Sequence, residues 1–288
     1  PELTIRGLLE RLGTGRWFRD YYILPFSGAI WSTPKSKVLD FPAQTLVQFF
    51  QNHALLNNCA QHQWFTVRGG SVEYVRRLAR VLERSGVDLR TGTPVNAIRR
   101  MRGGVLVKSA GGEWEPFDDV VFATHSNVTL SMLADPSRDE TKALGAIRFQ
   151  PNEAVLHSDM TLMPRRRACW SSWNYTEGAD RKPEERVDLT YWMNSLQPIP
   201  QDDPLFVTLN NTRRIREDLI HDTVSFNHPV YDLDAQKGRA ALTGLQGQRN
   251  TWFCGAWMKN GFHEDGLASA VDVVTAMADR YALRIAAE

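Results

Sequence analysis

Residues 252–270 decide the fold of this chain and read Trp252-Phe-Cys-Gly-Ala-Trp-Met-Lys-Asn-Gly-Phe-His-Glu-Asp-Gly-Leu-Ala-Ser-Ala270. They predict a short apolar strand that ends at Gly255 and a helix from about Gly266 to Arg280. The apolar stripe of this helix comprises Leu267, Ala270, Val271, Val274, Met277, Ala278 and Tyr281. A strand, a glycine turn and a helix N-terminus present free N–H groups that suit an anionic or electron-rich ligand. An ordinary βα unit with Gly255 and Gly266 as turn residues explains the pattern equally well.

The composition is that of a globular protein without an obvious charged partner. The 288 residues suffice for one large domain or two smaller ones. The balance of 34 basic and 33 acidic residues gives no electrostatic argument for binding nucleic acid or an anionic membrane. No apolar run reaches the roughly 20 residues that a membrane span requires. We therefore expect neither a nucleic-acid partner nor a transmembrane segment.

The cysteines and tryptophans give two further indications. Cys59, Cys169 and Cys254 are odd in number and widely spaced, which argues against a disulfide scaffold or a zinc site. We expect no metal and a reducing, cytoplasmic location. The nine tryptophans, several of them beside glycine or proline, indicate apolar walls around a pocket as readily as a core.

Residues 1–63 predict helices and loops. Gly13-Thr-Gly15 resembles half of a dinucleotide-binding turn, but without a preceding strand it is more typical of a helix C-cap. The aromatic stretch from Tyr21 to Pro34 fits either a packed loop, which we favour, or one wall of a substrate cavity. A helix is expected from Pro42 to His53.

Residues 64–147 follow an α/β order. Ser71 is a natural N-cap for a helix over residues 72–84. Strands are expected at 87–89, 94–98, 104–107 and 114–117, and residues 120–124 form an apolar strand of the buried parallel type. Ser126 or Asn127 is expected to cap the next helix. These features predict an α/β domain in which a nucleotide cofactor is possible.

Residues 148–247 differ in character. Four strands, at 154–157, 168–175, 187–193 and 205–209, lack intervening helices and therefore predict an antiparallel sheet. A loop and helix are expected over 235–248. The basic triplet Arg165-Arg166-Arg167 is interpreted as a solvated turn, with recognition of a carboxylate or phosphate as the alternative.

Six motifs, in this order along the chain, resemble those of a known superfamily. They are Val67-Arg-Gly-Gly-Ser71, Pro94-Val-Asn-Ala-Ile98, Asp119-Val-Val-Phe-Ala-Thr124, His228-Pro229, Phe253-Cys-Gly-Ala256 and Glu264-Asp-Gly-Leu-Ala-Ser-Ala270. The chain resembles the flavin-dependent amine oxidase superfamily, which includes phytoene-desaturase-like and protoporphyrinogen-oxidase-like enzymes. The resemblance is greatest to a bacterial group of NAD/FAD-binding proteins, at residues 29–34, 172–175 and 255–266, and it covers nearly the whole chain.

The resemblance assigns roles in FAD binding to particular residues. Val95 would contact the adenine side through its backbone, and Ala123 and Thr124 would lie near the dinucleotide. Gly255 and Ala256 would let the backbone approach the pyrophosphate or ribityl chain. The last motif adds Glu264 and Asp265, followed by Gly266 and Leu267, whose N–H groups would face the flavin pyrimidine oxygen.

The expected fold class is mixed α/β and α+β. A partial FAD/NAD(P)-binding Rossmann-like domain would comprise residues 64–147 and 248–288. It would be interleaved with an antiparallel-sheet substrate domain formed by residues 1–63 and 148–247. The cleft between such domains is a common place for a ligand.

One expected element of the superfamily is missing. Its members open with a strand, a GxGxxG turn and a helix, and these 288 residues contain no such segment. The chain starts at Pro1 and carries no signal-peptide pattern, so we expect a fragment. We expect this chain alone to be inactive and to bind FAD poorly or not at all.

The sequence leaves the catalytic residues unknown. Many family members have a lysine near the flavin N5, and no lysine here matches it. Lys259 is interpreted as a loop residue, and His263 as part of the helix cap rather than an acid or base. Cys254 is interpreted as a buried small residue rather than an attachment point for flavin.

Three functions fit this sequence. The first is an FAD-dependent oxidoreductase acting on a small apolar substrate, namely an unsaturated acyl chain, a polyene or an amine. The aromatic residues around Trp31, Trp173 and Trp192 favour an apolar substrate. The second is a flavin-dependent double-bond isomerase, which would turn over without consuming oxygen. The third is a non-catalytic or truncated FAD-fold module.

Overall fold

The chain forms two compact units in the computed structural model, which describes residues 3–31, 33–56, 63, 65–176 and 188–287. Unit 1 comprises Pro1–Leu89 and Gln150–His228, and unit 2 comprises Arg90–Phe149 and Pro229–Glu288. Cys59, Trp64 and Val187, which enter the predictions above, lie outside the described residues.

The two units differ from the predicted domains at two boundaries. Residues 64–89 join unit 1, although they were predicted to belong with the FAD-type domain. Residues 229–247 join unit 2, because their helix α10 (Leu233–Leu245) packs against α8 (Arg138–Gly145). The division at 149/150 lies close to the predicted one at 147/148.

The N-terminal part of unit 1 is helical. Its elements are α1 (Ile5–Arg11), α2 (Arg16–Phe18), the π-helix η1 (Arg19–Ile23), α3 (Leu24–Trp31), α4 (Lys35–Val38) and α5 (Ala43–Asn52). Gly13 follows α1 with φ +63°, a left-handed conformation that favours glycine just after a helix end. Gly13 therefore acts at a helix end, as predicted.

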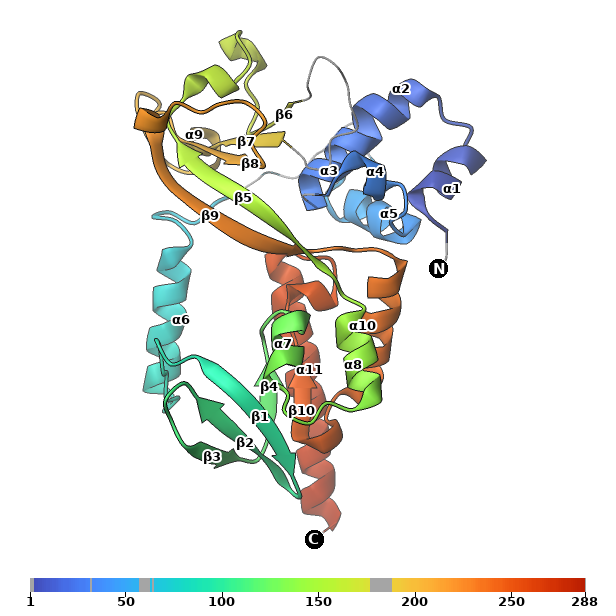
Figure 1. Ribbon diagram of the computed structural model, residues 1–288, viewed down its shortest axis with the longest axis vertical. Helices are drawn as coiled ribbons and strands as arrows, with labels where there is room; N and C mark the ends of the chain where they lie inside the picture. Colours follow the sequence, from blue (N-terminus) through green and yellow to red (C-terminus); the bar gives the residue numbers. More distant parts are fainter. Residues whose placement is uncertain (1–2, 32, 57–62, 64, 177–187, 288) are drawn as a thin grey trace. The chain divides into compact units, whose positions relative to one another are not determined.

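A five-stranded sheet forms the second part of unit 1, with the order β6-β7-β8-β5-β9. The strands are β5 (Phe149–His157), β6 (Trp173–Thr176), β7 (Asp188–Trp192), β8 (Phe206–Leu209) and β9 (Ile220–Pro229). The pairs β6–β7, β7–β8 and β5–β8 are antiparallel, as predicted. Figure 1 shows β5 and β9 as long neighbouring strands.

Two details of this sheet differ from the sequence prediction. The strand expected at 168–175 starts only at Trp173, because the 3-10 turn η3 (Arg167–Cys169) precedes it. The edge strand β9 was not predicted. Eight of its ten residues are exposed, and although Ile220, Val224 and Phe226 share one face, Asp222 and His228 interrupt the alternation of apolar residues on which strand prediction depends. The short helices η2 (Met160–Leu162), α9 (Met193–Leu196) and η4 (Glu217–Leu219) complete the sheet region.

Buried polar side chains cross this sheet in an ordered chain of hydrogen bonds. The backbone N–H of Asp159 donates to Nδ1 of His157 (3.1 Å), so Nε2 of His157 carries the proton and donates to Oγ1 of Thr208 (2.7 Å). Oγ1 of Thr208 lies 2.9 Å from Oγ1 of Thr190 on β7. His157 is fully buried, and burial lowers its pKa to about 4. The imidazole is therefore neutral at pH 7.

The remaining helix of unit 1, α6 (Val72–Arg84), keeps an uncovered apolar face. Val72, Val75, Leu78 and Val81 recur at helical spacing, and each is about half exposed. Ser71 precedes the helix, as predicted, but its side chain makes no capping hydrogen bond. The strand predicted at 87–89 is absent from the described structure.

Unit 2 contains a β-meander and a pair of parallel strands. The meander comprises β1 (Val95–Met101), β2 (Gly104–Ser109) and β3 (Trp114–Phe117), all antiparallel. The parallel pair comprises β4 (Val120–Phe122) and β10 (Thr251–Phe253). The other elements are α7 (Ser126–Met132), α8, α10, η5 (Gln248–Asn250), η6 (Ala256–Met258) and α11 (His263–Ala287).

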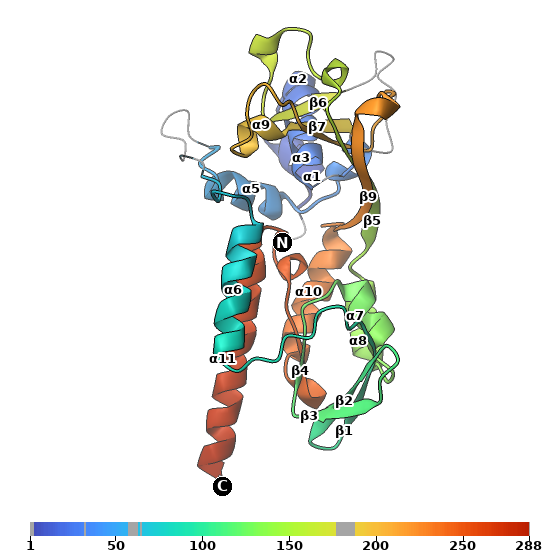
Figure 2. The ribbon, with the colours of Figure 1, turned by 90° about the vertical axis from the view of Figure 1, so that its left-hand side faces the viewer.

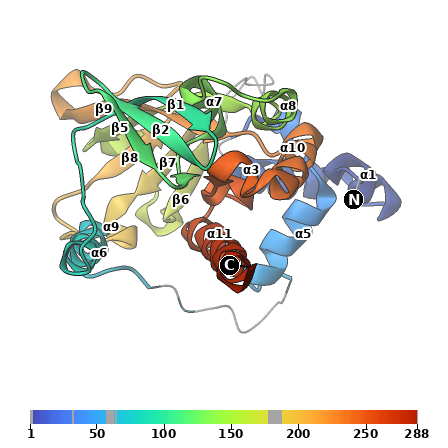
Figure 3. The ribbon, with the colours of Figure 1, turned by 90° about the horizontal axis from the view of Figure 1, so that it is seen from below.

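The core of unit 2 joins the meander, the parallel strands and helices α8 and α10. Its buried members include Ile98, Phe122, Leu144, Leu242 and Phe253. Helices α8 and α10 lie side by side (Figure 3). They approach closely because α10 has Gly238 at the contact, where a Cβ would lie 2.6 Å from the carbonyl oxygen of Ala143.

A buried ion pair links the meander to α8. Arg100 on β1 donates from Nη1 to Oε1 of Glu140 (2.8 Å) and from Nη2 to Oε2 (3.0 Å), and its Nε donates to Asp135 (2.9 Å). Burial opposes ionisation of Glu140, but hydrogen bonds from Arg100 and Ser137 outweigh it and lower the pKa of this carboxyl. Glu140 also completes a capping box with Ser137 at the start of α8.

Helix α11 packs through a face that shares Ala270 and Met277 with the predicted stripe but is centred on Val273. It is one continuous helix that ends beside the C-terminus (Figure 2). Val273 is buried against Trp252 and Cys254, with Ala270 and Met277 beside it. Leu267, Val271 and Val274, which the prediction placed on the packed stripe, are 61%, 53% and 63% exposed. The helix has two apolar faces, and the sequence does not indicate which one meets β10.

No helix within the described part of the chain combines the length and apolar character needed to cross a bilayer.

Candidate functional site

The carboxyl ends of β4 and β10 lie next to each other in unit 2. Phe253 is the register partner of Phe122, and the N–H of Cys254 donates to the carbonyl oxygen of Phe122 (2.9 Å). Thr124, which follows β4, therefore lies beside Gly255, which follows β10. Ligands of open parallel sheets commonly bind at such an edge. The structure thus brings together four of the predicted cofactor residues: Ala123, Thr124, Gly255 and Ala256.

Gly255 is held at this edge by two side chains. Its N–H donates to Oγ of Ser269 (2.8 Å), and Oγ of Ser269 donates to the carbonyl oxygen of Gly266 (2.8 Å). The φ of Gly255 is +137°, and a Cβ there would lie 2.7 Å from Nε1 of Trp257. Glycine is thus required at position 255 by its own backbone and by Trp257, independently of any approach to a cofactor.

Trp257 connects the two strand ends. Its indole Nε1 donates to the carbonyl oxygen of Thr124 (3.0 Å), and its side chain is buried in the core of unit 2. Oγ1 of Thr124 lies 2.9 Å from Oγ1 of Thr129 on α7. Sequence analysis did not single out Trp257. Its position one residue beyond Gly255-Ala256 was the only indication available.

The N-terminus of α11 lies at the same edge, but it starts earlier than predicted. The helix begins at His263, and the N–H of Gly266 already donates to the carbonyl oxygen of Phe262 (3.1 Å). The prediction that Gly266 presents a free N–H group is therefore wrong. The first turn instead leaves the N–H groups of residues 263–265 outside the i to i−4 pattern.

Acidic side chains already complement this helix end. Oδ2 of Asp265 accepts the N–H of Phe262 (3.0 Å), and Glu264 lies beside it in the first turn. Gly266 packs near Ala256, with the closest atom 3.7 Å from the position of a Cβ, whereas the side chain of Leu267 is exposed. An anionic group at this end would therefore meet carboxylates as well as N–H groups.

Val95 is held in the meander and not at the strand-end edge. It opens β1 opposite Ser109, where the β1–β2 register shifts before Ala97. Its side chain is exposed. The part of the chain that the structure describes shows no hydrogen bond between Val95 and the ends of β4 or β10.

The reactive side chains near the edge have structural partners. Cys254 is buried, and burial raises the pKa of its thiol, which keeps it protonated. Nζ of Lys259 pairs with Asp272 on α11 (2.9 Å). His263 is the exposed first residue of α11. Among the described residues, no partner orients any of these three side chains for a role as an acid or a base.

His125 was missed by the sequence analysis. It follows Thr124 directly, and its ring stacks on Phe149 with a centroid distance of 4.5 Å. Burial lowers the pKa of His125, so it is a neutral hydrogen-bonding group at pH 7. Its position just after a buried parallel strand was the available signal.

An aromatic pocket of about 700 Å³ lies within unit 1. Tyr21, Tyr22, Pro25, Phe26 and Ala29 form one side, and the segment Trp170–Trp173 with Tyr175, Leu189, Trp192 and Ser195 forms the other. The first side comes from η1 and α3, and a π-helical turn such as η1 is frequent at functional sites. Residues 21–31 of the stretch predicted as a packed loop are thus helical, and five of them line this pocket, whereas Trp31 is buried against Phe41 and Phe49.

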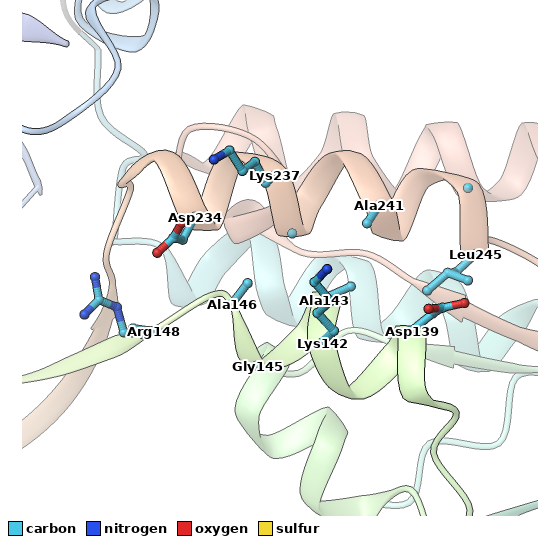
Figure 4. Close-up of a pocket in the computed structure, with 12 residues that line it drawn as sticks. Asp139, Lys142, Ala143, Gly145, Ala146, Arg148, Asp234, Lys237, Ala241 and Leu245 are labelled. Carbon is cyan, nitrogen blue, oxygen red and sulfur yellow. The ribbon is translucent and has the colours of Figure 1, made fainter. Parts of the chain in front are cut away.

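A second groove, of about 760 Å³, lies between α8 and α10 in unit 2 (Figure 4). Small residues form its floor, including Ala143, Ala146 and Ala241. Its rim carries charges of both signs, among them Lys142, Lys237, Asp139 and Asp234. None of the predicted cofactor residues lines this groove, and its mixed charge indicates no particular ligand.

Comparison with known proteins identifies one family model and many solved structures. Residues 8–204, well over half of the chain, match the model described as flavin containing amine oxidoreductase. No curated protein sequence matches.

Three solved structures illustrate the similarity in fold. A CLA-producing fatty acid isomerase from P. acnes is 16% identical, with a TM-score of 0.62 over 96% of this chain and 66% of that one. Cyclohexylamine oxidase from Brevibacterium oxydans is 11% identical, with a TM-score of 0.61 over 96% and 68%. Putrescine oxidase bound to putrescine is 15% identical, with a TM-score of 0.61 over 98% and 68%. The chain therefore spans about two thirds of the length of each.

Proposed function

This chain belongs to the flavin-containing amine oxidoreductase family, and from that premise we propose that the whole protein is an FAD-dependent oxidoreductase acting on a small apolar substrate. The observation that carries the proposal is the meeting of Thr124, Gly255, Ala256 and the N-terminus of α11 at the carboxyl edge of β4 and β10. FAD, when bound, supplies an acceptor for a hydride or for electrons.

The residues of this edge fit one part of a dinucleotide cofactor. Ala123, Thr124 and Ala256 would border it with backbone groups, and the N–H groups in the first turn of α11 would face a polar end of the cofactor. Trp257 fixes the distance between the two strand ends, and Ser269 fixes the orientation of the Gly255 peptide. These contacts orient the backbone before any ligand arrives.

The same edge lacks a feature that tight binding of a pyrophosphate requires. The two described parallel strands, β4 and β10, are followed by Ala123-Thr124 and Cys254-Gly255, and neither leads through a turn with GxGxxG spacing into a helix. We therefore propose that the 288-residue chain alone binds FAD weakly or not at all.

The aromatic pocket motivates the apolar substrate. Its walls are mainly aromatic, and its volume lies within the range of about 300–1,000 Å³ that is usual for small-molecule sites. An unsaturated acyl chain, a polyene and an amine remain the candidate substrates.

The decisive experiment is purification of the whole protein and of the 288-residue chain side by side. We expect FAD to be released on denaturation of the whole protein, and the chain alone to be colourless. Anaerobic addition of unsaturated acyl, polyene and amine compounds should then bleach the flavin absorbance of the whole protein. A yellow, FAD-loaded 288-residue chain would overturn the proposal of weak binding, and a whole protein without flavin would overturn the oxidoreductase proposal.

Product analysis under the same conditions separates the isomerase alternative. Conversion of a substrate without net bleaching and without an electron acceptor would identify an isomerase. If the whole protein also lacks a GxGxxG segment and holds no flavin, a non-catalytic FAD-fold module becomes the better description.

A further inference from the structure

One long helical stretch of unit 1 carries an exposed aromatic face. In residues 16–31, α2, η1 and α3 follow one another without a break. Four aromatic side chains in the first half of this stretch are between 39% and 67% exposed, namely Trp17, Phe18, Tyr21 and Tyr22. The ring of Trp17 stacks on that of Tyr21 with a centroid distance of 4.5 Å. The ring of Phe18 stacks on that of Tyr22 at 5.3 Å, so the four rings share one side of the stretch, which we call the aromatic face.

The residues between these rings are charged. Arg16, Arg19 and Asp20 are exposed or half-buried beside the aromatic face, and Nε of Arg19 donates to Oδ1 of Asp20 (2.7 Å). Residues 3–22 contain four arginines and two acids. One positive charge remains in excess when Asp40, the partner of one of these arginines, is counted as well. The region around the aromatic face is therefore weakly cationic.

The aromatic face runs into the aromatic pocket. Tyr21 and Tyr22 belong both to the exposed surface and to the lining of that pocket. Farther along the stretch, the ring of Tyr22 stacks on that of Phe26, which also lines the pocket (5.7 Å). A continuous row of stacked rings thus joins the surface to the pocket.

We propose that the aromatic face lies in the interface of a lipid bilayer, from which an apolar substrate passes into the pocket. Tryptophan and tyrosine concentrate at membrane interfaces, because each joins an apolar ring to a polar group. A helix with aromatic residues on one side and arginine on the other is typical of helices that lie in the plane of the interface. The passage of substrate rests on the proposed function, whereas the binding to lipid involves residues of unit 1 alone and no flavin.

The pocket also distinguishes a bilayer from a protein partner. A second copy of the chain, or another segment of the whole protein, seated on Tyr21 and Tyr22 would cover the pocket that these two tyrosines line. A bilayer would instead hold an apolar substrate at the same place and at a high local concentration. The small positive excess agrees with this partner, because anionic lipids attract cationic segments near the membrane surface.

Flotation of the whole protein with phosphatidylcholine vesicles tests the binding to lipid. We expect the protein to float with the vesicles, and to bind about fivefold tighter when about a third of the lipid is phosphatidylglycerol. Trp17→Ser removes the most exposed ring of the aromatic face and should lower the partition into vesicles about tenfold. Phe65→Ser is the matched control and should leave the partition unchanged, because Phe65 is 89% exposed in the same unit but lies outside the pocket lining. Circular dichroism checks that both variants are folded.

Quenching by lipids with brominated acyl chains locates the contact. These vesicles should quench part of the tryptophan emission of the unchanged protein. Trp17→Phe keeps an aromatic ring, so this variant should still float with the vesicles and should lose most of the quenching. Trp114→Phe, in strand β3 of unit 2, should float and keep the quenching.

The passage of substrate is tested by the bleaching of flavin in the whole protein. With an unsaturated acyl or polyene substrate dissolved in the vesicles, the bleaching should be about tenfold slower in Trp17→Ser than in the unchanged protein, in proportion to the lost partition. With a short, water-soluble substrate of the same class, the two rates should be equal. Equal rates with both substrates would overturn the passage of substrate from the bilayer.

Three results would overturn the binding to lipid. They are a whole protein that does not float, equal partition of the Trp17→Ser and Phe65→Ser variants, and a dimer in light scattering that Trp17→Ser dissociates. The last result would identify a second copy as the occupant of the aromatic face. A whole protein that holds and reduces FAD but does not float overturns this inference alone, whereas one that floats without flavin overturns only the proposed function.

Discussion

The indole nitrogen of Trp257 donates a hydrogen bond to the carbonyl oxygen of Thr124 across 3.0 Å, and this contact ties together the ends of the two parallel strands. The same indole packs so closely on Gly255 that no side chain fits there. The edge at which we propose that the cofactor lies is therefore set by a tryptophan and a glycine that depend on each other.

Gly255→Ala should destabilise unit 2. The φ of +137° is unfavourable for alanine, and its Cβ would lie 2.7 Å from Nε1 of Trp257, so we expect a loss of about 2 kcal/mol or more in unfolding free energy. Urea unfolding measures it. Gly266→Ala is the control, because no atom lies closer than 3.7 Å and the site is helical; it should be neutral or stabilising by up to about 1 kcal/mol. Equal effects of the two changes would contradict this account.

Removing the charge of Glu140 should also destabilise unit 2. Glu140→Gln leaves the buried guanidinium of Arg100 with one carboxylate partner, Asp135, and the expected cost is about 3 kcal/mol. Chemical denaturation followed by circular dichroism measures the loss. Glu217→Gln removes one partner of the exposed Arg214–Glu217 pair and should change stability by less than about 0.5 kcal/mol. If Glu140→Gln lowered the stability as little as Glu217→Gln does, the description of Arg100 as buried would be wrong.

His157 should make unit 1 sensitive to acid. Its folded pKa of about 4 lies below its ordinary value of 6.5, so between these values the unfolded chain binds a proton that the folded chain does not. By linkage, the neutral imidazole makes its whole contribution to the unfolding free energy above pH 6.5. This contribution decreases by about 3 kcal/mol in total as the pH drops towards 4.

Denaturation series at pH 7, 6, 5 and 4, set by buffer, test this dependence. His157→Gln, which does not titrate, should be less stable at pH 7 but lose less stability than the unchanged protein as the pH falls. The buried carboxyl of Glu140, in unit 2, titrates in both proteins and cancels in the comparison, whereas Asp159 interacts electrostatically with His157 and its pKa changes with the substitution. Parallel pH profiles would rule out a buried neutral imidazole.

Asp119→Asn should loosen the C-terminal half of α11. Asp119 accepts hydrogen bonds from Nε1 of Trp252 (2.9 Å) and from the hydroxyl of Tyr281, and it lies 3.4 Å from Nη1 of Arg280. Hydrogen exchange should become faster around residues 277–283 than around 263–270. Asp118→Asn, at the exposed neighbouring residue, should leave the exchange pattern unchanged. Uniform acceleration along α11 would contradict a local role for Asp119.

The sequence by itself determined the type and order of many elements. Apolar periodicity and glycine positions were sufficient for α5, α6, the meander β1–β3, the parallel character of β4 and the antiparallel strands β7 and β8. These signals are local, because each depends on residues within one element and its turn. The motif order also indicated the family, which the match over residues 8–204 confirms.

Only the tertiary structure decided which faces and partners are used. Helix α11 has two apolar stripes, and contact with Trp252 and Cys254 selected the one with Val273 rather than Leu267 and Val271. The same helix starts at His263 and not near Gly266 as predicted, because Asp265 in its first turn accepts the N–H of Phe262. The pairing of Arg100 with Glu140, and of Trp257 with Thr124, joins residues 40 and 133 positions apart. Such contacts arise from packing, and no local pattern in a single sequence specifies them.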